Sequence, residues 1–363
     1  MKETMARICI VTTRNIFDSP CIAKYRELLE EPFDILYFDR CGIEEDCGAN
    51  LYHKYTAKLQ ANAGKVQKLF AYIGFWLYAN RILRKYKYEK IIVFPTQAGW
   101  LIQHKLCHRY KGKYILDIRD YAGENRRLIS FMTNRIVNSA GLCSITSPAY
   151  KVFLPKRNYV ISHNVQPIDE DLIQQYRTRI RDPKAPITLS FIGSVRFIEQ
   201  QKRLITLFKN DERYHLKFIG RGSEQLADFC DKDAIKNVTL IGRFEPSQLS
   251  VFYMETDLAI NIYGNNDPYL DYALSNKLYS AAIMGMPILV SPKTYMAEIS
   301  EKYGFGYSIN LADASAPDQL FAFFCNVDRS ALFTACDMFM ESVKQDNQEY
   351  AAAIKAYIYN SKG

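Results

Sequence analysis

The sequence predicts an α/β protein with two halves, each built around a parallel sheet. Its 363 residues exceed what one ordinary hydrophobic core holds, so two domains are the default. Strand-like and helix-like stretches alternate along the chain, which is typical of parallel sheets with crossover helices. The polar stretch RTRIRDPKAP, residues 177–186, interrupts this alternation, and the pattern then restarts. Ligands of such sheets bind at the carboxyl ends of the strands.

The first half begins with a strand and continues with a helix that Ser19 and Pro20 open, a pair that suits a helix start. Its strands are short runs of apolar and β-branched residues. Shorter strand-like stretches, SITS and YVISHN, follow the strand expected over 113–120. Strands are expected over 7–13, 33–39, 90–96 and 113–120, and helices over 19–31 and 100–111.

The second half repeats the alternation after the polar stretch. Strands are expected over 187–194, 216–222, 237–244, 257–263 and 286–291, with helices between them. The resulting division is an N-terminal domain at 1–178, a C-terminal domain at 186–330, and C-terminal helices at 331–363 that pack back toward the N-terminal domain.

Composition excludes several classes of protein. A hydrophobic content of 48% with 24% charged residues fits a soluble globular protein. The start, MKETMARICIVTT, runs directly into a strand and carries no signal-peptide pattern. No apolar stretch approaches the ~20 residues of a membrane-spanning helix. Nine cysteines without a CxxC pair indicate reduced thiols, so we expect a cytoplasmic protein.

We expect neither a metal nor a bound cofactor. The five histidines and nine cysteines show no metal-ligand spacing. Asp231 and Asp233 resemble an Asp-x-Asp metal motif, but they precede a strand instead of following one. The loop GRGSEQ, residues 220–225, has Gln225 where a dinucleotide fingerprint needs its third glycine.

The net charge of +8 is concentrated in one segment. Residues 51–90 hold nine basic residues and one acid, so their excess of eight equals that of the whole chain. The same segment contains the apolar and aromatic run LFAYIGFWLYA, residues 69–79. One interpretation is a helix that lies on an anionic membrane surface. The other is a core helix with solvated flanks. The membrane contacts are expected from Lys65, Lys68, Trp76, Arg81 and Arg84. No recognition helix or zinc spacing accompanies this charge, so nucleic acid is not expected.

Two stretches of the second half form a candidate anion site. In FIGSVRFIEQQKRLI, residues 191–205, a strand ends at Gly193 and Ser194, and Arg196 and Lys202 follow. In ALSNKLYSAAIMGMPILV, residues 273–290, Lys277 stands at the start of an apolar helix. Arginine supplies a planar fork of donors, lysine a compact charge, and a helix N-terminus also favours an anion. The alternative is a helix with an incidental lysine.

The second half resembles the GT-B glycosyltransferases, in particular the large retaining family 4. The resemblance rests on the order FIGSVR…K, LKFIGRGSE, NVTLIGRFEPSQL, DLAINIY and SNKLYSAAIMGMPILVS over about residues 187–310. The last segment is similar to the PNKLYE type of capsule and O-antigen sugar transferases. VTTRNIFDSP, YILDIRDYAG and VISHNV resemble acceptor-side segments of that family more weakly.

The resemblance implies a GT-B fold, with two Rossmann-like domains whose parallel sheets face a central cleft. It implies that Arg196 and Lys202 hold the donor diphosphate, completed by Ser275, Asn276 and Lys277, and that Arg243 and Phe244 face the nucleotide base. The donor-binding residues expected on this basis are Gly193, Ser194, Arg196, Lys202, Gly222, Arg243, Phe244, Ser275, Asn276, Lys277 and Ser280. On the acceptor side they are Arg14, Asn15, Gln97 and Arg119, with Asp120 placed to orient a hydroxyl.

The chain departs from the family at two positions. The family often carries two glutamates with seven residues between them, the second of which grips the donor ribose. Tyr272 and Ser280 occupy those positions here, although Asp271 is adjacent to the first. A serine hydroxyl can still give ribose one hydrogen bond, worth ~0.5–1.5 kcal/mol.

The function implied is transfer of a sugar from a nucleoside-diphosphate sugar to a surface glycan acceptor linked to a polyprenyl diphosphate. The enzyme would be a retaining, metal-independent hexosyltransferase, peripheral on the inner face of the cell membrane. Two alternatives remain open: a nucleotide-sugar epimerase on the same scaffold, and a non-catalytic partner subunit, which the two missing glutamates suggest.

Overall fold

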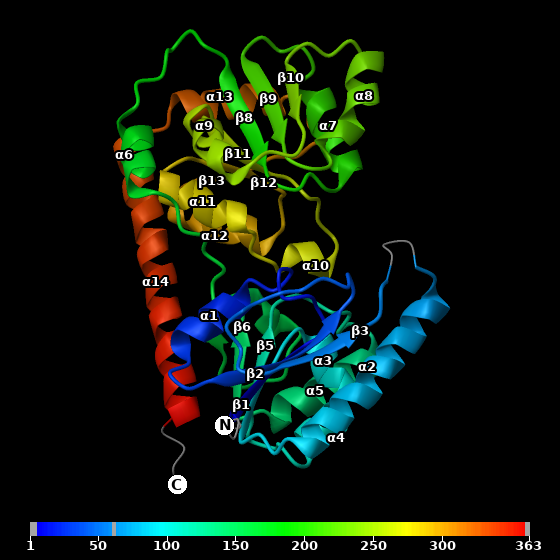
Figure 1. The fold of residues 1–363 in the computed structure, drawn as a ribbon. Coiled ribbons are helices and arrows are strands. Elements are labelled where there is room, and N and C mark those ends of the chain that lie inside the picture. Colours follow the sequence, from blue (N-terminus) through cyan, green and yellow to red (C-terminus); the bar gives the residue numbers. More distant parts are fainter. Residues whose placement is uncertain (1–5, 60–62, 360–363) are drawn as a thin grey trace. The chain divides into compact units, whose positions relative to one another are not determined.

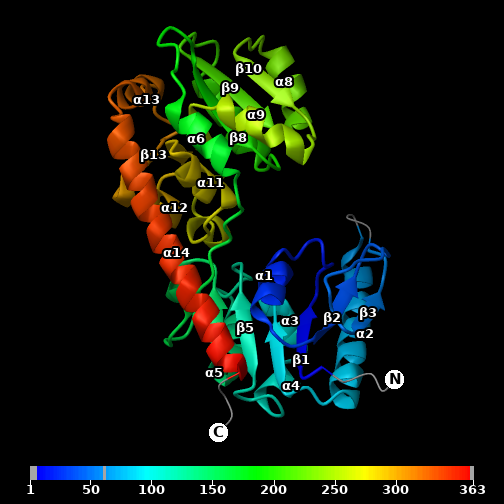
Figure 2. The same ribbon diagram turned by 60° about the vertical axis from the view of Figure 1, so that its left-hand side comes forward.

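The structure is a computed structural model, and it describes residues 6–59 and 63–359. The chain divides into two compact units, Met1–His163 with Gln345–Gly363 (unit 1) and Asn164–Lys344 (unit 2). Each unit contains one sheet whose described strand pairs are all parallel (Figure 1). The long helix α14 (Arg329–Tyr359) begins in unit 2 and ends in unit 1 (Figure 2).

The sheet of unit 1 has seven strands in the order β3-β2-β1-β4-β5-β6-β7. They are β1 (Ile8–Thr12), β2 (Phe33–Asp39), β3 (Tyr52–Thr56), β4 (Lys90–Val93), β5 (Tyr114–Ile118), β6 (Leu142–Ile145) and β7 (Val160–Ile161). The strand order reverses between β1 and β4, and this reversal opens a crevice at the carboxyl edge.

Helices cover both faces of this sheet. They are α1 (Cys21–Leu28), α2 (Lys65–Lys85), α3 (Thr96–Leu101), α4 (Gln103–Cys107) and α5 (Arg127–Ser139), with a 3₁₀ turn at Pro148–Val152. Tyr25 of α1 and Tyr350 and Ile354 of α14 share one buried cluster with β1, β2 and β4. On the other face, Phe75 of α2 stacks on Phe38 of β2 at 5.5 Å between ring centroids. Figure 1 shows α2, α3 and α5 grouped together, apart from α1.

Three expectations for unit 1 need correction. The first helix is shorter than 19–31, because it begins at Cys21 and ends at Leu28. The helix expected over 100–111 is two short helices, α3 and α4, which meet at Ile102. The strand β3 was not expected, because its residues YHKYT lie inside the basic segment. It pairs with β2 in parallel register along its whole length.

The sheet of unit 2 has six strands in the order β10-β9-β8-β11-β12-β13. They are β8 (Ile187–Ile192), β9 (Tyr214–Ile219), β10 (Val238–Ile241), β11 (Leu258–Asn261), β12 (Ile288–Val290) and β13 (Gly306–Ser308). The helices are α6 (Glu170–Thr178), α7 (Ile198–Leu207), α8 (Ala227–Lys232), α9 (Leu249–Met254), α10 (Pro268–Asp271), α11 (Asn276–Met284), α12 (Tyr295–Tyr303) and α13 (Ala316–Cys325), with 3₁₀ turns at Ser223–Leu226 and Pro246–Gln248.

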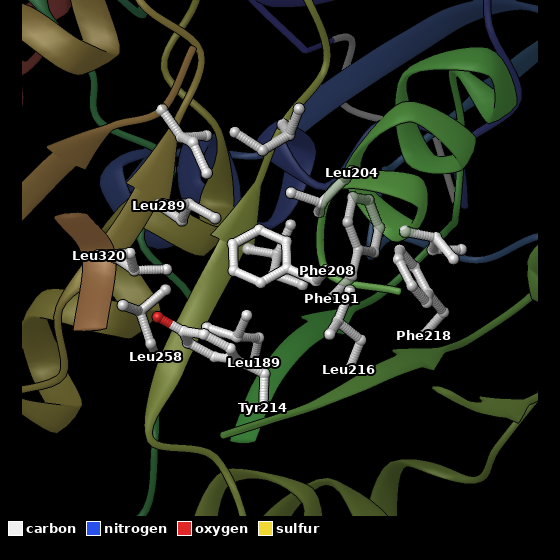
Figure 3. Packing of buried hydrophobic residues seen from close by; sticks show 14 of the residues in the cluster. Leu189, Phe191, Leu204, Phe208, Tyr214, Leu216, Phe218, Leu258, Leu289 and Leu320 are labelled. Carbon is white, nitrogen blue, oxygen red and sulfur yellow. The ribbon is translucent and has the colours of Figure 1, made fainter. Parts of the chain in front are cut away.

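Two apolar clusters hold the faces of this sheet. On one face, β8 and β9 pack against α7 and α13 through fully buried side chains (Figure 3). The labelled side chains of that cluster are Leu189, Phe191, Leu204, Phe208, Tyr214, Leu216, Phe218, Leu258, Leu289 and Leu320. On the other face, α11 buries Leu278, Tyr279 and Met284 among residues of α12 and α14. The strand ends of β8, β9 and β11 are therefore held in fixed positions.

The chain enters unit 2 before the polar stretch that the sequence analysis uses as a linker. Helix α6 covers the first residues of that stretch, and Tyr176 lies in the same cluster as α11. The Tyr176 hydroxyl donates to the Thr256 carbonyl at 3.0 Å. Arg179 and Arg181 both pair with the buried carboxylate of Asp257. Residues 164–178, which the sequence analysis assigns to the first domain, thus fall in unit 2.

We expect Ile354→Ala to lower the stability of unit 1 by about 2–5 kcal/mol, because it removes a fully buried side chain from the core. The two tryptophans of the chain, Trp76 and Trp100, both lie in unit 1, so tryptophan fluorescence during urea unfolding reports on that unit. The exposed Lys355→Ala is the matched control, and its effect should stay within about 0.5 kcal/mol. Equal midpoint shifts in the two variants would contradict this assignment.

Candidate active site

Two glycines bring the ends of β8 and β9 into close approach. Gly193 and Gly220 follow these strands with φ angles of 123° and 130°, which few other residues adopt. A Cβ atom on Gly220 would lie 2.1 Å from the Gly193 carbonyl oxygen. The Gly193 N–H donates to the Ile219 carbonyl at 2.8 Å. The loop after β8 is therefore fixed against the loop after β9.

Lys277 lies at this point, in the first turn of α11. Its Nζ donates a hydrogen bond to the Tyr263 hydroxyl at 2.6 Å and lies 4.1 Å from the centre of the Phe191 ring. A Cβ atom on Gly193 would be 3.8 Å from the same nitrogen. The predicted juxtaposition of Lys277 with the end of β8 is present in the structure.

Arg196 provides a second positive charge near Lys277. Burial, and to a smaller extent the Arg196 guanidinium, lower the pKa of Lys277 to about 7. Arg196 is exposed, and no described carboxylate forms an ion pair with either side chain. We call Gly193, Arg196, Tyr263 and Lys277 the strand-end cation site. Two cations without an acid to neutralise them favour an anionic ligand.

The N-terminus of α11 adds backbone donors. Ser275 occupies the N-cap position without capping the helix, since its hydroxyl donates to Asn261 Oδ1 at 2.8 Å. Asn276 accepts a hydrogen bond from the Asn164 amide at 2.8 Å. Uncapped N–H groups at the positive end of a helix attract anions, which adds to the effect of Lys277.

Lys202 points to a different set of groups. Its Nζ pairs with Glu199 at 2.9 Å and lies 5.8 Å from the centre of the Phe229 ring. The preceding residue, Gln201, is fully buried and donates to the Ile262 carbonyl at 2.6 Å. The described contacts of Lys202 therefore do not include the residues of the strand-end cation site, and Ser194 is exposed beside that site.

The remaining predicted donor residues line the loops after β9 and β10. The Gly222 N–H donates to Glu224 Oε2 at 2.8 Å, and a Cβ atom on Gly222 would meet the Val195 carbonyl oxygen at 2.3 Å. Arg243 is exposed, and Phe244 packs edge-on against Phe252 at 5.2 Å. These loops lie beside the loop after β8, because β8, β9 and β10 are neighbours.

Ser280 is buried one turn further along α11. It lies near Tyr253 of α9, and burial raises the pKa of that phenol. Tyr272 is half-buried. Burial also raises the pKa of the neighbouring Asp271 carboxyl group, whose Oδ1 accepts the Asn266 N–H. In the described structure, the Ser280 side chain is thus largely enclosed by the protein.

The carboxyl edge of unit 1 brings the predicted acceptor residues together. Arg14 follows β1 and pairs with Asp120, which follows β5, at 3.1 Å. Arg119 is mostly buried and pairs with Asp117 at 3.2 Å. Gln97 is half-buried in the first turn of α3, after β4. This edge therefore presents cations that carboxylates already balance.

Asn15 has a structural role in this edge. Its amide nitrogen donates to Asp39 at 3.0 Å and to Glu45 at 2.7 Å, and its oxygen accepts the Arg40 N–H. Lys24 is not among the predicted site residues, and its Nζ donates to the His163 carbonyl and to Asn347. Burial lowers the pKa of Lys24 to about 8. The sequence analysis missed Tyr263, whose place after β11 at the carboxyl edge is the signal that could have revealed it.

Helix α2 exposes an apolar stripe. We call the following exposed side chains the α2 face: Val66, Leu69, Phe70, Ile73, Trp76 and Leu77. Lys65, Lys68, Arg81 and Arg84 are exposed toward the two ends of the same helix. The core interpretation holds for Phe75, which is fully buried, and Tyr72 is half-buried and bonded to Arg40. No helix in the described ranges has the length and apolar character needed to span a bilayer.

The fold is similar to solved glycosyltransferase structures over nearly the whole chain. One is sucrose-phosphate synthase from Thermosynechococcus elongatus, with 14% identity, a TM-score of 0.66, and coverage of 97% of this chain and 98% of that one. Another is HepE from Anabaena in complex with UDP and glucose, with 12% identity, a TM-score of 0.66, and coverage of 97% and 100%.

A third is WaaG, a glycosyltransferase involved in lipopolysaccharide biosynthesis, with 10% identity, a TM-score of 0.62, and coverage of 98% and 100%. No protein-family model and no curated protein sequence matches the chain. The neighbours are GT-B glycosyltransferases, and the two parallel sheets agree with that architecture, so the predicted GT-B fold is confirmed.

We expect Gly220→Ala to destabilise unit 2 by about 1–3 kcal/mol, because its φ angle and the Gly193 carbonyl both oppose a side chain. Gly242→Ala is the matched control, since open space surrounds that position. Circular dichroism during thermal unfolding compares the two. Wild-type stability of Gly220→Ala would show that the loop after β8 is not held as described.

Proposed function

We propose that the protein is a glycosyltransferase that moves a sugar from a nucleoside-diphosphate sugar to a glycan acceptor. The observation that carries this proposal is the strand-end cation site on a GT-B fold, where Arg196 and Lys277 carry no compensating acid. A diphosphate matches this site in charge. The UDP-bound neighbour, HepE, makes UDP-sugars the first donors to test.

The chemistry needs stabilisation of a leaving group. The bond between the anomeric carbon and the terminal phosphate oxygen breaks, and that carbon forms a new bond to the acceptor oxygen. Negative charge develops on the released diphosphate, and fixed cations and helix N–H groups lower its energy. Loss of one such donor typically costs about 3–4 kcal/mol of transition-state stabilisation. We propose that retention of anomeric configuration and independence of metal accompany this chemistry.

The acceptor hydroxyl must be oriented and must lose its proton. Asp120 suits the first task, because it follows β5 at the carboxyl edge and Arg14 fixes its carboxylate. Gln97 and Arg119 lie on the neighbouring strand ends and offer further hydrogen-bonding groups. We propose that the acceptor is a surface glycan under construction, carried on a polyprenyl diphosphate.

The α2 face supports a membrane location for this reaction. Six exposed apolar side chains on one helix are costly in water, and burial of each stabilises an interfacial position. The basic residues at both ends match anionic headgroups, at about 1 kcal/mol each near the surface. We propose a cytoplasmic enzyme that docks on the inner face of the cell membrane through α2.

A non-catalytic partner subunit is the second candidate. One observation favours it: Ser280 and Tyr272 stand where the family often has glutamates, and Ser280 is buried. Such a subunit would bind nucleotide without turning it over. We expect transfer activity, because the two cations of the strand-end site serve a diphosphate leaving group.

We expect Arg196→Ala to lower turnover about 100-fold with little loss of stability, because Arg196 is exposed on a loop. Lys202→Ala should act in the same direction if Lys202 leaves Glu199 to reach the donor. The assay follows UDP released from a panel of UDP-sugars, with GDP- and dTDP-sugars after it.

Lys217→Ala is the control, since Lys217 pairs with Glu255 and belongs to no predicted site. Wild-type turnover in Arg196→Ala would contradict the donor assignment. Binding of UDP without any transfer would favour the non-catalytic subunit.

We expect the protein to sediment with vesicles that contain anionic lipid, and to be released as salt rises, because the Debye length falls below about 10 Å. Reversal of Lys65, Lys68, Arg81 and Arg84 to Glu should abolish this binding. Replacement of Leu69, Phe70 and Trp76 by Ser should weaken it at every salt concentration.

The matched control reverses four exposed lysines of unit 2, namely Lys184, Lys232, Lys236 and Lys293, with the same change of charge. This control should still sediment. Equal release of both reversed variants would show that net charge alone, and not α2, directs the protein to the membrane.

A further inference from the structure

Lys277 is enclosed in a way that disfavours its positive charge. Its amine lies over the Phe191 ring and 5.1 Å from the centre of the Tyr263 ring, and it bonds to the Tyr263 hydroxyl. Phe197 packs on the other side of Tyr263 at 5.4 Å between centroids. The ring faces attract an ammonium ion weakly, but they replace water around the amine and supply no full negative charge.

The groups that face Lys277 are few. Arg196, on the loop after β8, is positive at every physiological pH and repels an ammonium ion. Tyr263, after β11, has its own pKa raised to about 12 by burial, so it stays neutral near pH 8. Ser275 and Asn276, on the first turn of α11, do not titrate, and neither does Phe191 of β8. No carboxylate acts on Lys277 among the described residues.

We propose that Lys277 takes up a proton when the donor diphosphate binds, and that Tyr263 is the positioning residue that holds it in place for this step. The proposal rests on the proposed function, because it takes the diphosphate as the ligand. Above the pKa of Lys277, the free enzyme carries a mostly neutral amine next to Arg196, and below it both groups are cations. The bound diphosphate places negative charge beside the amine, so the ammonium becomes the favoured form of Lys277.

The phenol of Tyr263 suits both states of the amine. A tyrosine hydroxyl donates to a neutral amine and accepts from an ammonium, so one hydrogen bond persists through protonation. Its ring is fixed between Phe191, at 5.8 Å, and Phe197. Lys277 therefore gains its charge without leaving its place beside Gly193.

The burial that lowers the pKa of Lys277 to about 7 sets the direction of the pH dependence. Below that value, the free enzyme already holds the proton and binding takes up none. Above it, each bound diphosphate takes up about one proton, so affinity falls by up to about tenfold for each pH unit. The affinity stops falling once the pH exceeds the pKa that Lys277 has in the complex.

Isothermal titration calorimetry at pH 8, in buffers of different ionisation enthalpy, measures this uptake directly. The probes are UDP, UDP-glucose and inorganic pyrophosphate, the last to separate diphosphate binding from recognition of the nucleoside. The terminal phosphate of UDP, with a pKa of about 6, is already ionised and contributes no proton at this pH. We expect the wild type to take up about one proton per UDP bound.

Lys277→Arg keeps a permanent charge, so its uptake should be near zero and its affinity should no longer fall as pH rises from 7 to 9. Lys277→Met should also show no uptake, which covers the case in which arginine does not fit. Tyr263→Phe keeps the ring and the packing. It should retain the uptake and lose about tenfold in UDP affinity, an effect that a residue needed only for folding would not give.

Lys217→Arg is the control lysine, and its uptake should match that of the wild type. UDP binding without proton uptake, or wild-type uptake in Lys277→Arg, would overturn this inference and leave the proposed function standing. Failure of UDP, GDP, dTDP and pyrophosphate to bind at all would overturn the proposed function and the inference with it.

Discussion

The burial of α11 is the constraint on which the candidate donor site depends. A lysine on a solvated helix would sample many positions and offer a diphosphate little more than bulk charge. Here Leu278, Tyr279 and Met284 fix the helix in a core, and Gly285, with a φ angle of 76°, ends it sharply before β12. The first turn of α11 consequently has one position. Lys277 is directed at Gly193 by the packing of residues that never touch a ligand.

The alternation of strands and helices was enough to predict the fold, and the departures have local causes. Strand β3 was missed because its residues, YHKYT, carry charge and sit in a basic segment, whereas pairing with β2 decides their conformation. Lys277 and Arg196 could be predicted, since a strand end and a helix start are visible in the sequence. The direction of Lys202 could not. One residue earlier, Gln201 points into the core, and a helix turns by about 100° per residue.

The replacement of family glutamates by Ser280 and Tyr272 changes how the ribose side of such a site can work. A carboxylate accepts two hydrogen bonds from a ribose and holds its charge near the donor. Ser280 is uncharged and buried, so it offers a ribose at most one neutral hydrogen bond. Under the proposed function, donor recognition would therefore depend more on the diphosphate than on the ribose. The two cations of the strand-end site are the physical basis for that expectation.

The two carboxyl edges differ in how they balance charge, and this difference separates their ligands. At the edge of unit 1, Arg14 pairs with Asp120 and Arg119 with Asp117, so these two cations are neutralised within the protein. Such an edge attracts no anion strongly, but it offers carboxylate and guanidinium groups fixed for hydrogen bonds to neutral hydroxyls. At the edge of unit 2, Arg196 and Lys277 have no such partners among the described residues. That edge suits an anionic ligand. Under the proposed function, a sugar hydroxyl on the first edge and a diphosphate on the second are the ligands that fit these two electrostatic conditions, and a transferase that joins an acceptor hydroxyl to a nucleotide-bound sugar needs both.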